Sequence, residues 1–265
     1  MISRNTINAS PSSYEGEDPP VPVERFTEVL EDLRAKILDG THPIGEPLPH
    51  TERLKETYGV SAAVITRVMK ELKAEGLIWR VANRGMIVEP PPVAVDLPVA
   101  IAPHHEHQRW REACEHAGIT GRIDEFGHTF RIGAVPSVAQ PLGIAEDDPI
   151  MWWLRVAVVN EQLAVFYDRI YYPWAVLGDV PPGTSIPQSQ ARALSRINPN
   201  TCYADITTTV RPILDDESNL FRLSEGMPIY DITRVIRDEH GRPIELVRRL
   251  ANPLRVRLVE RGLAL

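Results

Sequence analysis

Residues 51–88 read TERLKETYGVSAAVITRVMKELKAEGLIWRVANRGMIV and decide the fold of the N-terminal part of the chain. Their apolar spacing predicts a short helix from about Thr51 to Tyr58, which Gly59 can end in the left-handed conformation that glycine adopts readily. Ser61 is a favourable N-cap for a following helix, and Gly76 would end that helix. The apolar residues that recur at helical spacing in the second helix, and should face inward, are Ile65, Val68, Met69 and Leu72.

An upstream helix and a downstream β-hairpin complete this pattern. The upstream helix would end at Gly40, and its inward residues are Phe26, Val29, Leu30, Leu33 and Ile37. Downstream, Leu77 to Val81 and Met86 to Val88 have the composition of short strands that the intervening residues would connect. Three helices followed by a hairpin predict a winged helix-turn-helix over residues 23–89.

Such a unit places its last helix in the major groove of DNA. Arg67 and Lys70 would point outward from that helix toward phosphates or a guanine edge, and Arg84 would lie at the hairpin tip. The residues expected at the DNA interface are Arg53, Ser61, Ala63, Thr66, Arg67, Lys70, Arg84 and Gly85. A three-helix packing unit that binds no nucleic acid is the alternative interpretation.

The distribution of charge is compatible with DNA binding but does not prove it. The 265-residue chain has a formal net charge of −7, yet residues 53–84 hold seven cationic and three anionic side chains. Attraction to DNA depends on local rather than total charge, so the negative sum is no objection. A solvated helix surface would give a similar cluster, and charge alone therefore leaves both interpretations open.

Length and proline content predict two domains. The chain has 265 residues, more than one domain usually needs. Residues 1–22 are rich in serine, proline and acidic residues, which is typical of a disordered arm. Clustered prolines predict an extended linker over residues 90–103, so residues 104–265 would form the second domain.

The sequence gives little support to several other classes of protein. No apolar run reaches the about 18–20 residues that span a bilayer, and residues 1–24 lack the pattern of a signal peptide, which predicts a cytoplasmic protein. Cys114 and Cys202 are expected to be buried thiols. His104, His105 and His107 lack metal-site spacing, so we expect no metal and no cofactor. No hydrolase, NTPase or dinucleotide-binding motif occurs.

The C-terminal part contains an internal repeat. Residues 144–156 match residues 223–235. Both segments contain an apolar residue, then a Glu, a Pro-Ile pair and an Arg-Val pair, at the same spacing. Each copy then continues through a hairpin turn into a second apolar strand that ends at Pro173 or Pro253. We expect two related units of helix end, strand, hairpin and strand to form one antiparallel sheet, with a cavity at their seam.

Residues 24–90 resemble the DNA-binding domain of the GntR family of bacterial regulators. The resemblance lies in the Leu-Pro, Gly-Val-Ser, Glu-Gly-Leu and Arg-Gly elements within Leu48 to Ser61, Glu71 to Ile78 and Asn83 to Gly85. Members of that family usually carry arginine, a common DNA contact, at the positions that are here Glu52, Ala62 and Thr66. These departures affect the operator sequence that the protein would read.

Residues 95–260 resemble the UTRA effector domain of the HutC branch of that family, which implies an α+β protein with a chorismate-lyase-like sheet. The most specific segments are Asp168 to Pro173 and Gly241 to Glu245. The resemblance implies a cleft whose arginines and glutamate hold a metabolite. The matching residues, with Arg234 added as the repeat partner of Arg155, are Arg155, Asp168, Arg169, Arg234 and Glu245. A second frequent arginine is replaced by Ala157, and Leu254 replaces an aromatic or polar residue.

These observations predict a DNA-binding repressor that acts as a homodimer on an inverted repeat and responds to a small polar or anionic metabolite. For each charged residue of the expected cleft, a structural ion pair across strands is an equally open interpretation. Two further hypotheses are compatible with the sequence. One is a repressor without an effector, for example of mobile-element transfer genes, and the other is a lyase-like enzyme, which rests on fold similarity alone.

Overall fold

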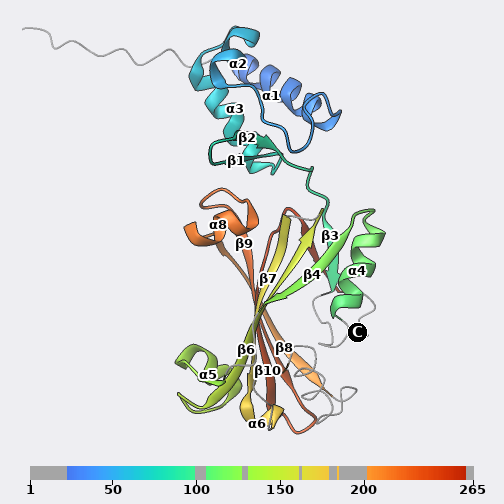
Figure 1. Ribbon diagram of the computed structural model, residues 1–265, viewed down its shortest axis with the longest axis vertical. Helices are drawn as coiled ribbons and strands as arrows, with labels where there is room; N and C mark the ends of the chain where they lie inside the picture. Colours follow the sequence, from blue (N-terminus) through green and yellow to red (C-terminus); the bar gives the residue numbers. More distant parts are fainter. Residues whose placement is uncertain are drawn as a thin grey trace, which may run out of the picture.

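The computed structural model describes residues 23–98, 106–126, 131–160, 163–178, 184 and 202–260. The expected disordered arm, the last part of the expected linker, and His104 and His105 lie outside the described residues. The predicted α+β fold is confirmed, with a helical N-terminal region followed by an antiparallel sheet (Figure 1).

The N-terminal region has the predicted three helices and hairpin. Its elements are α1 (Val23–Leu38), α2 (Thr51–Tyr58), α3 (Ala62–Ala74), β1 (Ile78–Val81) and β2 (Gly85–Val88). Gly59 has φ 61° and ψ 38°, the left-handed turn that the sequence predicts. Ser61 caps α3, because its Oγ accepts a hydrogen bond from the Val64 amide at 3.4 Å.

The inward faces of the three helices form one core. Leu33 of α1 and Ile65, Val68 and Leu72 of α3 are each 0% exposed. Met69, predicted to face inward, lies at the margin of this core, whereas Val64 is buried within it. This packing turns the opposite side of α3 toward solvent.

The C-terminal region is built on a seven-stranded antiparallel sheet. Its path is β4-β6-β7-β10-β9-β8, with β5 paired to β6, and a small parallel pair joins β11 to β3. The strands are β3 (Val95–Pro98), β4 (Gly121–Phe126), β5 (Arg131–Gly133), β6 (Pro149–Val159), β7 (Leu163–Pro173), β8 (Tyr203–Pro212), β9 (Pro228–Arg237), β10 (Pro243–Ala251) and β11 (Val256–Val259). The helices are α4 (Glu106–His116), α5 (Pro136–Leu142), α6 (Trp174–Leu177) and α8 (Asp215–Phe221).

The sheet order reflects the internal repeat. Each copy is a helix followed by a hairpin, α5-β6-β7 in the first and α8-β9-β10 in the second. The second strands of the two hairpins pair at the centre, so the halves meet at the β7–β10 seam, as the repeat predicts. In that seam Asp168 is opposite Arg249, and Arg169 is opposite Arg248.

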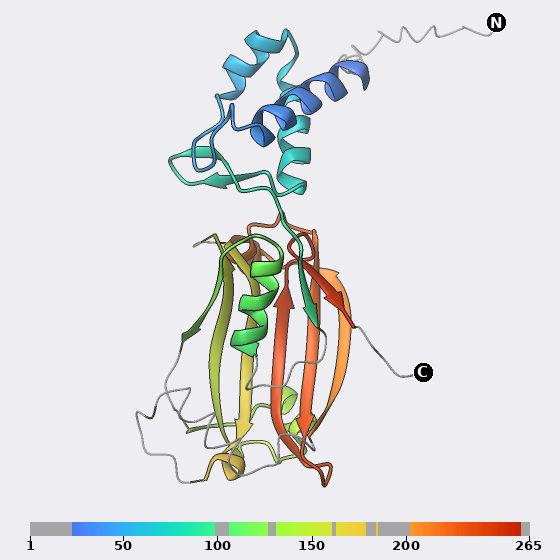
Figure 2. The ribbon, with the colours of Figure 1, turned by 90° about the vertical axis from the view of Figure 1, so that its right-hand side faces the viewer.

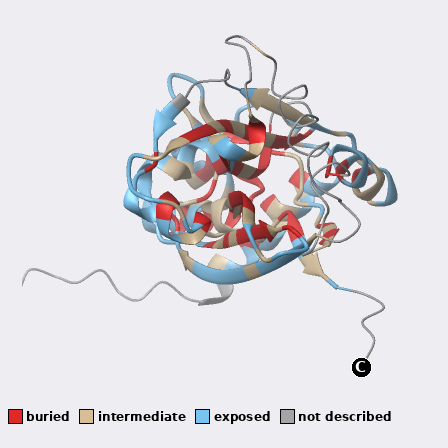
Figure 3. Ribbon diagram, turned by 90° about the horizontal axis from the view of Figure 1, so that it is seen from below, coloured by how far each residue is buried: buried red, intermediate tan, exposed pale blue. Residues whose placement is uncertain are grey.

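The two faces of the sheet carry different helices, as Figures 1 and 2 show from two sides. The α4 face is covered by α4, β3, β11 and α6, and Figure 2 looks onto it. The α5–α8 face carries α5 over one end and α8 over the other. Buried residues gather in the interior and exposed residues around the rim (Figure 3).

The N-terminal region contacts the sheet domain just after β2. Glu89 is 4% exposed and forms an ion pair with Arg222, the residue that follows α8. Arg255 Nη2 donates a hydrogen bond to the Pro90 carbonyl at 3.2 Å. Burial lowers the pKa of Arg255 to about 10, although Glu89 opposes the shift. The junction therefore contains specific charged contacts as well as a chain connection.

Candidate DNA interface and candidate effector site

The exposed side of α3 presents small and basic residues. Ala63, Thr66 and Lys70 are exposed, at spacings that place them on one side of the helix. Ser61 is exposed as well, but its hydroxyl is used as the helix cap. The predicted interface residues of α3 thus lie on the surface, and its N-terminal end is unobstructed by large side chains.

A groove of about 510 Å³ lies between residues 47–53, the β1–β2 hairpin and one residue of α3. Met69 lies on the helix side of this groove, and Arg53, Arg84 and Gly85, all predicted interface residues, also line it. Arg84 Nη2 donates to the Gly45 carbonyl at 2.9 Å, which holds the tip arginine near the groove. Arg80 lines the groove too and was missed as an interface residue, although a single cationic residue within the otherwise apolar strand β1 gives a signal for it, and the structure shows it exposed.

The basic residues of this surface differ in whether they already contact other side chains of the protein. Within the part of the chain that the structure describes, Arg53, Lys70, Arg80 and Arg84 make no ion pair. Arg67 lies with its guanidinium 4.1 Å from the centre of the Phe26 ring on α1, a cation–π contact. Unpaired cations flanking an exposed helix give a surface that can bind phosphates on both sides of a groove.

Four of the five expected effector residues lie together on the α4 face. Arg155, Asp168, Arg234 and Glu245 are each no more than 5% exposed. Two residues that the sequence analysis missed, Glu106 at the start of α4 and Arg249 of β10, complete a buried charge cluster. No repeat or motif marks Glu106, and the β7–β10 register alone brings Arg249 to Asp168.

Three guanidinium groups in this cluster surround two carboxylates. Arg155 Nη2 donates to Glu106 Oε2 at 2.5 Å and to Asp168 Oδ2 at 2.6 Å. Arg249 donates to Glu106 and, from Nε, to Asp168 Oδ1 at 2.7 Å. Arg234 Nη2 lies 3.3 Å from Glu106 Oε2. Because Arg155 and Arg234 occupy equivalent repeat positions, each half of the sheet contributes one arginine to the same carboxylate.

The electrostatics of the cluster favour the charged form of Glu106. Burial alone would raise the pKa of Glu106, but attraction from Arg155, Arg234 and Arg249 outweighs it and holds that pKa below the ordinary value. Glu245 Oε1 lies 3.5 Å from Arg234 Nη2, and burial raises the pKa of Glu245 despite this ion pair and a hydrogen bond that Tyr172 donates to it. The arginines therefore act as an anion site that Glu106 occupies.

Arg169 does not belong to this cluster. Consecutive residues of a strand point to opposite faces, so Asp168 on the α4 face places Arg169 on the α5–α8 face. The expectation that all five residues line one cleft is therefore corrected for Arg169. The strand alternation that separates the two residues is visible in the sequence.

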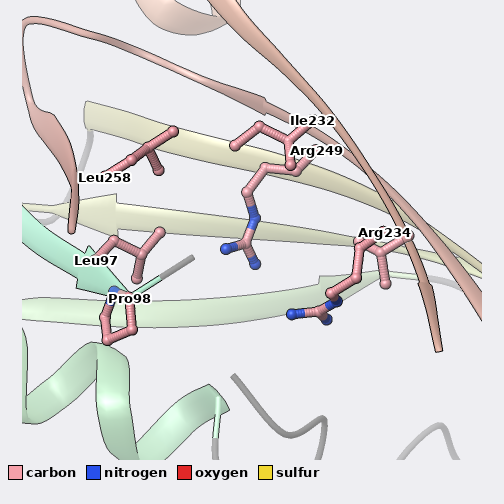
Figure 4. A pocket seen from close by; sticks show the side chains of 7 residues that line it. Leu97, Pro98, Ile232, Arg234, Arg249 and Leu258 are labelled. Carbon is pink, nitrogen blue, oxygen red and sulfur yellow. The ribbon is translucent and has the colours of Figure 1, made fainter. Parts of the chain in front are cut away.

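Little free space remains beside the arginines of the cluster. A cavity of about 10 Å³ lies next to Arg234 and Arg249. Figure 4 shows these guanidinium groups projecting from the sheet into one space, with Leu97, Pro98 and Leu258 on its other side. Such a volume holds about one water molecule. This space is too small for a metabolite, and the arginines beside it are already engaged with Glu106.

The described residues show no group of three or more potential metal ligands. His107 Nε2 lies 2.9 Å from Glu125 Oε1, so this histidine has a carboxylate partner. Cys114 is a buried thiol as expected, and burial raises its pKa to about 11. Cys202, expected to be buried, is partly exposed. Within the described part, no helix is long and apolar enough to cross a membrane.

Comparisons with known proteins match both halves of the chain. The family described as bacterial regulatory proteins, gntR family, matches residues 26–88, and the UTRA domain family matches residues 128–257. The HTH-type transcriptional repressor NagR of Bacillus subtilis is 22% identical over 240 residues, which cover 85% of this chain and 88% of NagR. The HTH-type transcriptional regulator Mce2R of Mycobacterium tuberculosis is 41% identical over 51 residues, which cover 19% of this chain and 21% of Mce2R.

Among solved structures, PhnF from Mycobacterium smegmatis aligns with a TM-score of 0.49 and 19% identity, covering 87% of this chain and 97% of PhnF. The two family matches fall on the helix-helix-helix-hairpin unit and on the antiparallel sheet, in that order. The chain therefore belongs to the GntR family of bacterial regulatory proteins and carries a UTRA domain after its DNA-binding region.

Proposed function

We propose that this protein is a cytoplasmic transcriptional repressor that binds an operator through α3 and the β1–β2 hairpin. The observation that carries this proposal is the groove beside the hairpin, which is lined by Arg53, Arg80 and Arg84 without ion-pair partners among the described residues, with Lys70 exposed on α3 next to Met69. Cations placed on both sides of a helix that can enter the major groove fit phosphates on both of its edges.

The test begins with recovery of the bound sequence from a genomic DNA library, followed by affinity measurements over a range of salt concentrations. Lys70→Ala, Arg80→Ala and Arg84→Ala should each weaken binding and lower the slope of log affinity against log salt by about one. Arg109→Ala, at an exposed position on α4, serves as the matched control. Unchanged affinity and slope in the triple variant would rule out this docking surface.

We propose further that the protein acts as a homodimer on an inverted repeat, joined through the sheet domain. A single winged helix covers too little DNA for the affinities usual in specific recognition, and two-fold operators match two-fold proteins. Strand β8 supports a contact in this region, because it is an edge strand whose Tyr203 and Val210 are 50% and 60% exposed. Light scattering at micromolar concentration should give twice the chain mass, and a monomer that binds a half-site tightly would contradict the proposal.

For the sheet domain we propose that a small polar or anionic metabolite exchanges with Glu106 at Arg155 and Arg234 and thereby alters DNA affinity. The support is chemical, because two arginines that already hold one carboxylate present the donors that another anion needs. Arg169, on the other face, is not part of this proposal.

Removal of the internal carboxylate tests this exchange. Glu106→Ala should raise the affinity for the effector, since the competing group is gone, whereas Glu112→Ala, which removes a partly exposed carboxylate paired with Arg109 on α4, should leave it unchanged. Calorimetry with a panel of sugar phosphates and organic acids would measure both. By linkage, an effector that weakens DNA binding must itself bind more weakly in the presence of DNA, typically by about 1–3 kcal/mol.

A repressor without an effector is the second candidate, and one observation favours it. The buried arginines are already paired with carboxylates, and the space beside them is only about 10 Å³. If neither the wild-type protein nor Glu106→Ala binds any member of the panel while the operator is still bound, this second function replaces the first.

A further inference from the structure

An open cavity of about 320 Å³ lies on the α5–α8 face, between the two helices that cover its ends. Arg169 and Arg248 lie on its floor, and Thr233 is the next residue across the sheet. Tyr167, Arg211 and Asp231 also line it. Its volume is in the range of small-molecule sites, about 300–1,000 Å³.

The two floor arginines are arranged in an unfavourable way for the protein alone. Arg169 and Arg248 are directly opposite each other at the β7–β10 seam, and like charges at facing positions of neighbouring strands repel. Neither makes an ion pair with any residue that the structure describes. Arg169 Nε donates to the Tyr167 hydroxyl at 3.3 Å, and Arg248 Nη2 donates to the Ser137 carbonyl at 2.5 Å.

One donor atom of Arg248, which lines this cavity, is left without an acceptor. Arg248 Nε is buried and has no hydrogen-bond partner among the described residues. A buried donor without an acceptor is costly, and such groups usually mark a site for water, an ion or a ligand. A negatively charged acceptor placed between Arg169 and Arg248 would reduce the repulsion between them and could accept the hydrogen bond that Arg248 Nε lacks.

The third arginine of the cavity, Arg211, has carboxylate partners within the protein. Arg211 donates to both Glu217 oxygens, at 2.7 and 2.8 Å, and to Asp231 Oδ2 at 2.8 Å. These carboxylates are therefore engaged with Arg211. On the α4 face likewise, Arg155 and Arg249 have carboxylate partners. Among the arginines of the two sheet faces named above, which also include Arg155, Arg211, Arg234 and Arg249, lack of a carboxylate partner is thus particular to Arg169 and Arg248.

We propose that Arg169 and Arg248 form a second anion site, which binds a carboxylate or phosphate group of a small molecule. Guanidinium groups match the paired oxygens of both anions, and Thr233 and Tyr167 supply hydroxyl groups for the rest of the ligand. The site is independent of the exchange at Glu106, because it is on the opposite face of the sheet.

The site also adjoins a route to the DNA-binding region. Glu217 and Arg222 lie in and just after α8, the helix beside the cavity. Glu217 holds Arg211 at the cavity wall, and Arg222 holds Glu89 at the domain junction. An anion that rearranges the cavity wall therefore acts on the same short helix that contacts the DNA-binding region.

The experiment is a titration of the full-length protein with inorganic phosphate at low ionic strength, followed by calorimetry and thermal unfolding. Phosphate should bind and raise the melting temperature of the wild-type protein. Arg169→Gln with Arg248→Gln should weaken phosphate binding at least about tenfold, the loss expected for charge-assisted hydrogen bonds. Without phosphate this double variant should melt no lower than the wild type, because the repulsion is removed.

Two matched variants separate this site from the rest of the protein. Arg242→Gln removes an exposed arginine that pairs with Asp238, and Arg109→Gln removes an exposed arginine that pairs with Glu112 on α4. Both should retain wild-type phosphate affinity. Equal stabilisation of the wild type and the double variant, absence of phosphate binding, or a change of oligomeric state in the double variant would each overturn the proposal, the last by assigning this face to a second copy.

Discussion

Single side chains decide how the sheet domain is held together on its α4 face. Glu106 is the first residue of α4, and its carboxylate is bound by arginines from three different strands. Helix α4 is therefore held to the sheet at its N-terminal end by ion pairs of Glu106. Farther along, Trp110 packs edge-on against Phe166. Loss of the charge on Glu106 leaves three buried guanidinium groups with too few carboxylates.

At this scale we predict that Glu106→Gln destabilises the protein by about 3–5 kcal/mol at neutral pH, the usual cost of breaking a buried ion pair from one side. The folded pKa of Glu106 lies below its ordinary value of 4.5, so its stabilisation is present above that pH and is lost as the pH falls toward the folded pKa. Denaturant unfolding of both proteins should therefore show a gap that is wide at pH 7 and narrows below about pH 4.5. A gap that does not depend on pH would contradict the role of the charge.

Individual elements are set mostly by local sequence signals. The α2–α3 turn depends on Gly59 at φ 61°, and a β-carbon added there would meet no atom within 4 Å. Only backbone strain should therefore oppose substitution. We predict that Gly59→Ala destabilises the N-terminal domain by about 1–2 kcal/mol, and that Gly59→Asn costs less, because asparagine tolerates this conformation. Thermal unfolding of the two variants tests the order, and equal losses would point to a cause other than the left-handed turn.

The same local signals explain which parts of the structure the sequence could predict. Helical spacing predicts α2 and α3, with Gly59 and Ser61 marking the turn between them. The internal repeat predicts the two hairpins and the seam at which they meet. The buried charge cluster could not be found in this way. Arg249 reaches Asp168 only through the β7–β10 register, and Glu106 belongs to a helix 49 positions before Arg155. Long-range pairing of this kind leaves no periodic trace in a single sequence.

At the scale of the whole molecule, the DNA-binding region and the sheet domain are joined by few contacts. Glu89 is nearly buried, and its ion pair with Arg222 links the end of the hairpin to the end of α8. We predict that Arg222→Gln lowers the free energy of unfolding of the N-terminal region by about 1–3 kcal/mol, because it weakens the pairing of a buried carboxylate. Calorimetry should show the effect, with Arg242→Gln as the exposed control.

An unchanged transition in Arg222→Gln would mean that the junction is held by the chain connection and Arg255 alone. If the transition does shift, the operator affinity of the same variant becomes informative. A variant that keeps full affinity but loses its response to any ligand of the sheet domain would identify this ion pair as the link between the two functions.

The mirrored order of the sheet also has a consequence for the way the chain folds. Each hairpin joins strands that are neighbours in sequence, whereas Asp168 and Arg249 at the seam are 81 positions apart. Closing a short loop costs less chain entropy than closing a long one, and proteins rich in distant contacts fold slowly. The two hairpins should therefore form early and dock late, and docking must remove water from Asp168 and Arg249 together. Variants at the hairpin tips would then slow refolding, because the hairpins form before the slow step, whereas variants within the seam, which forms last, would mainly speed unfolding.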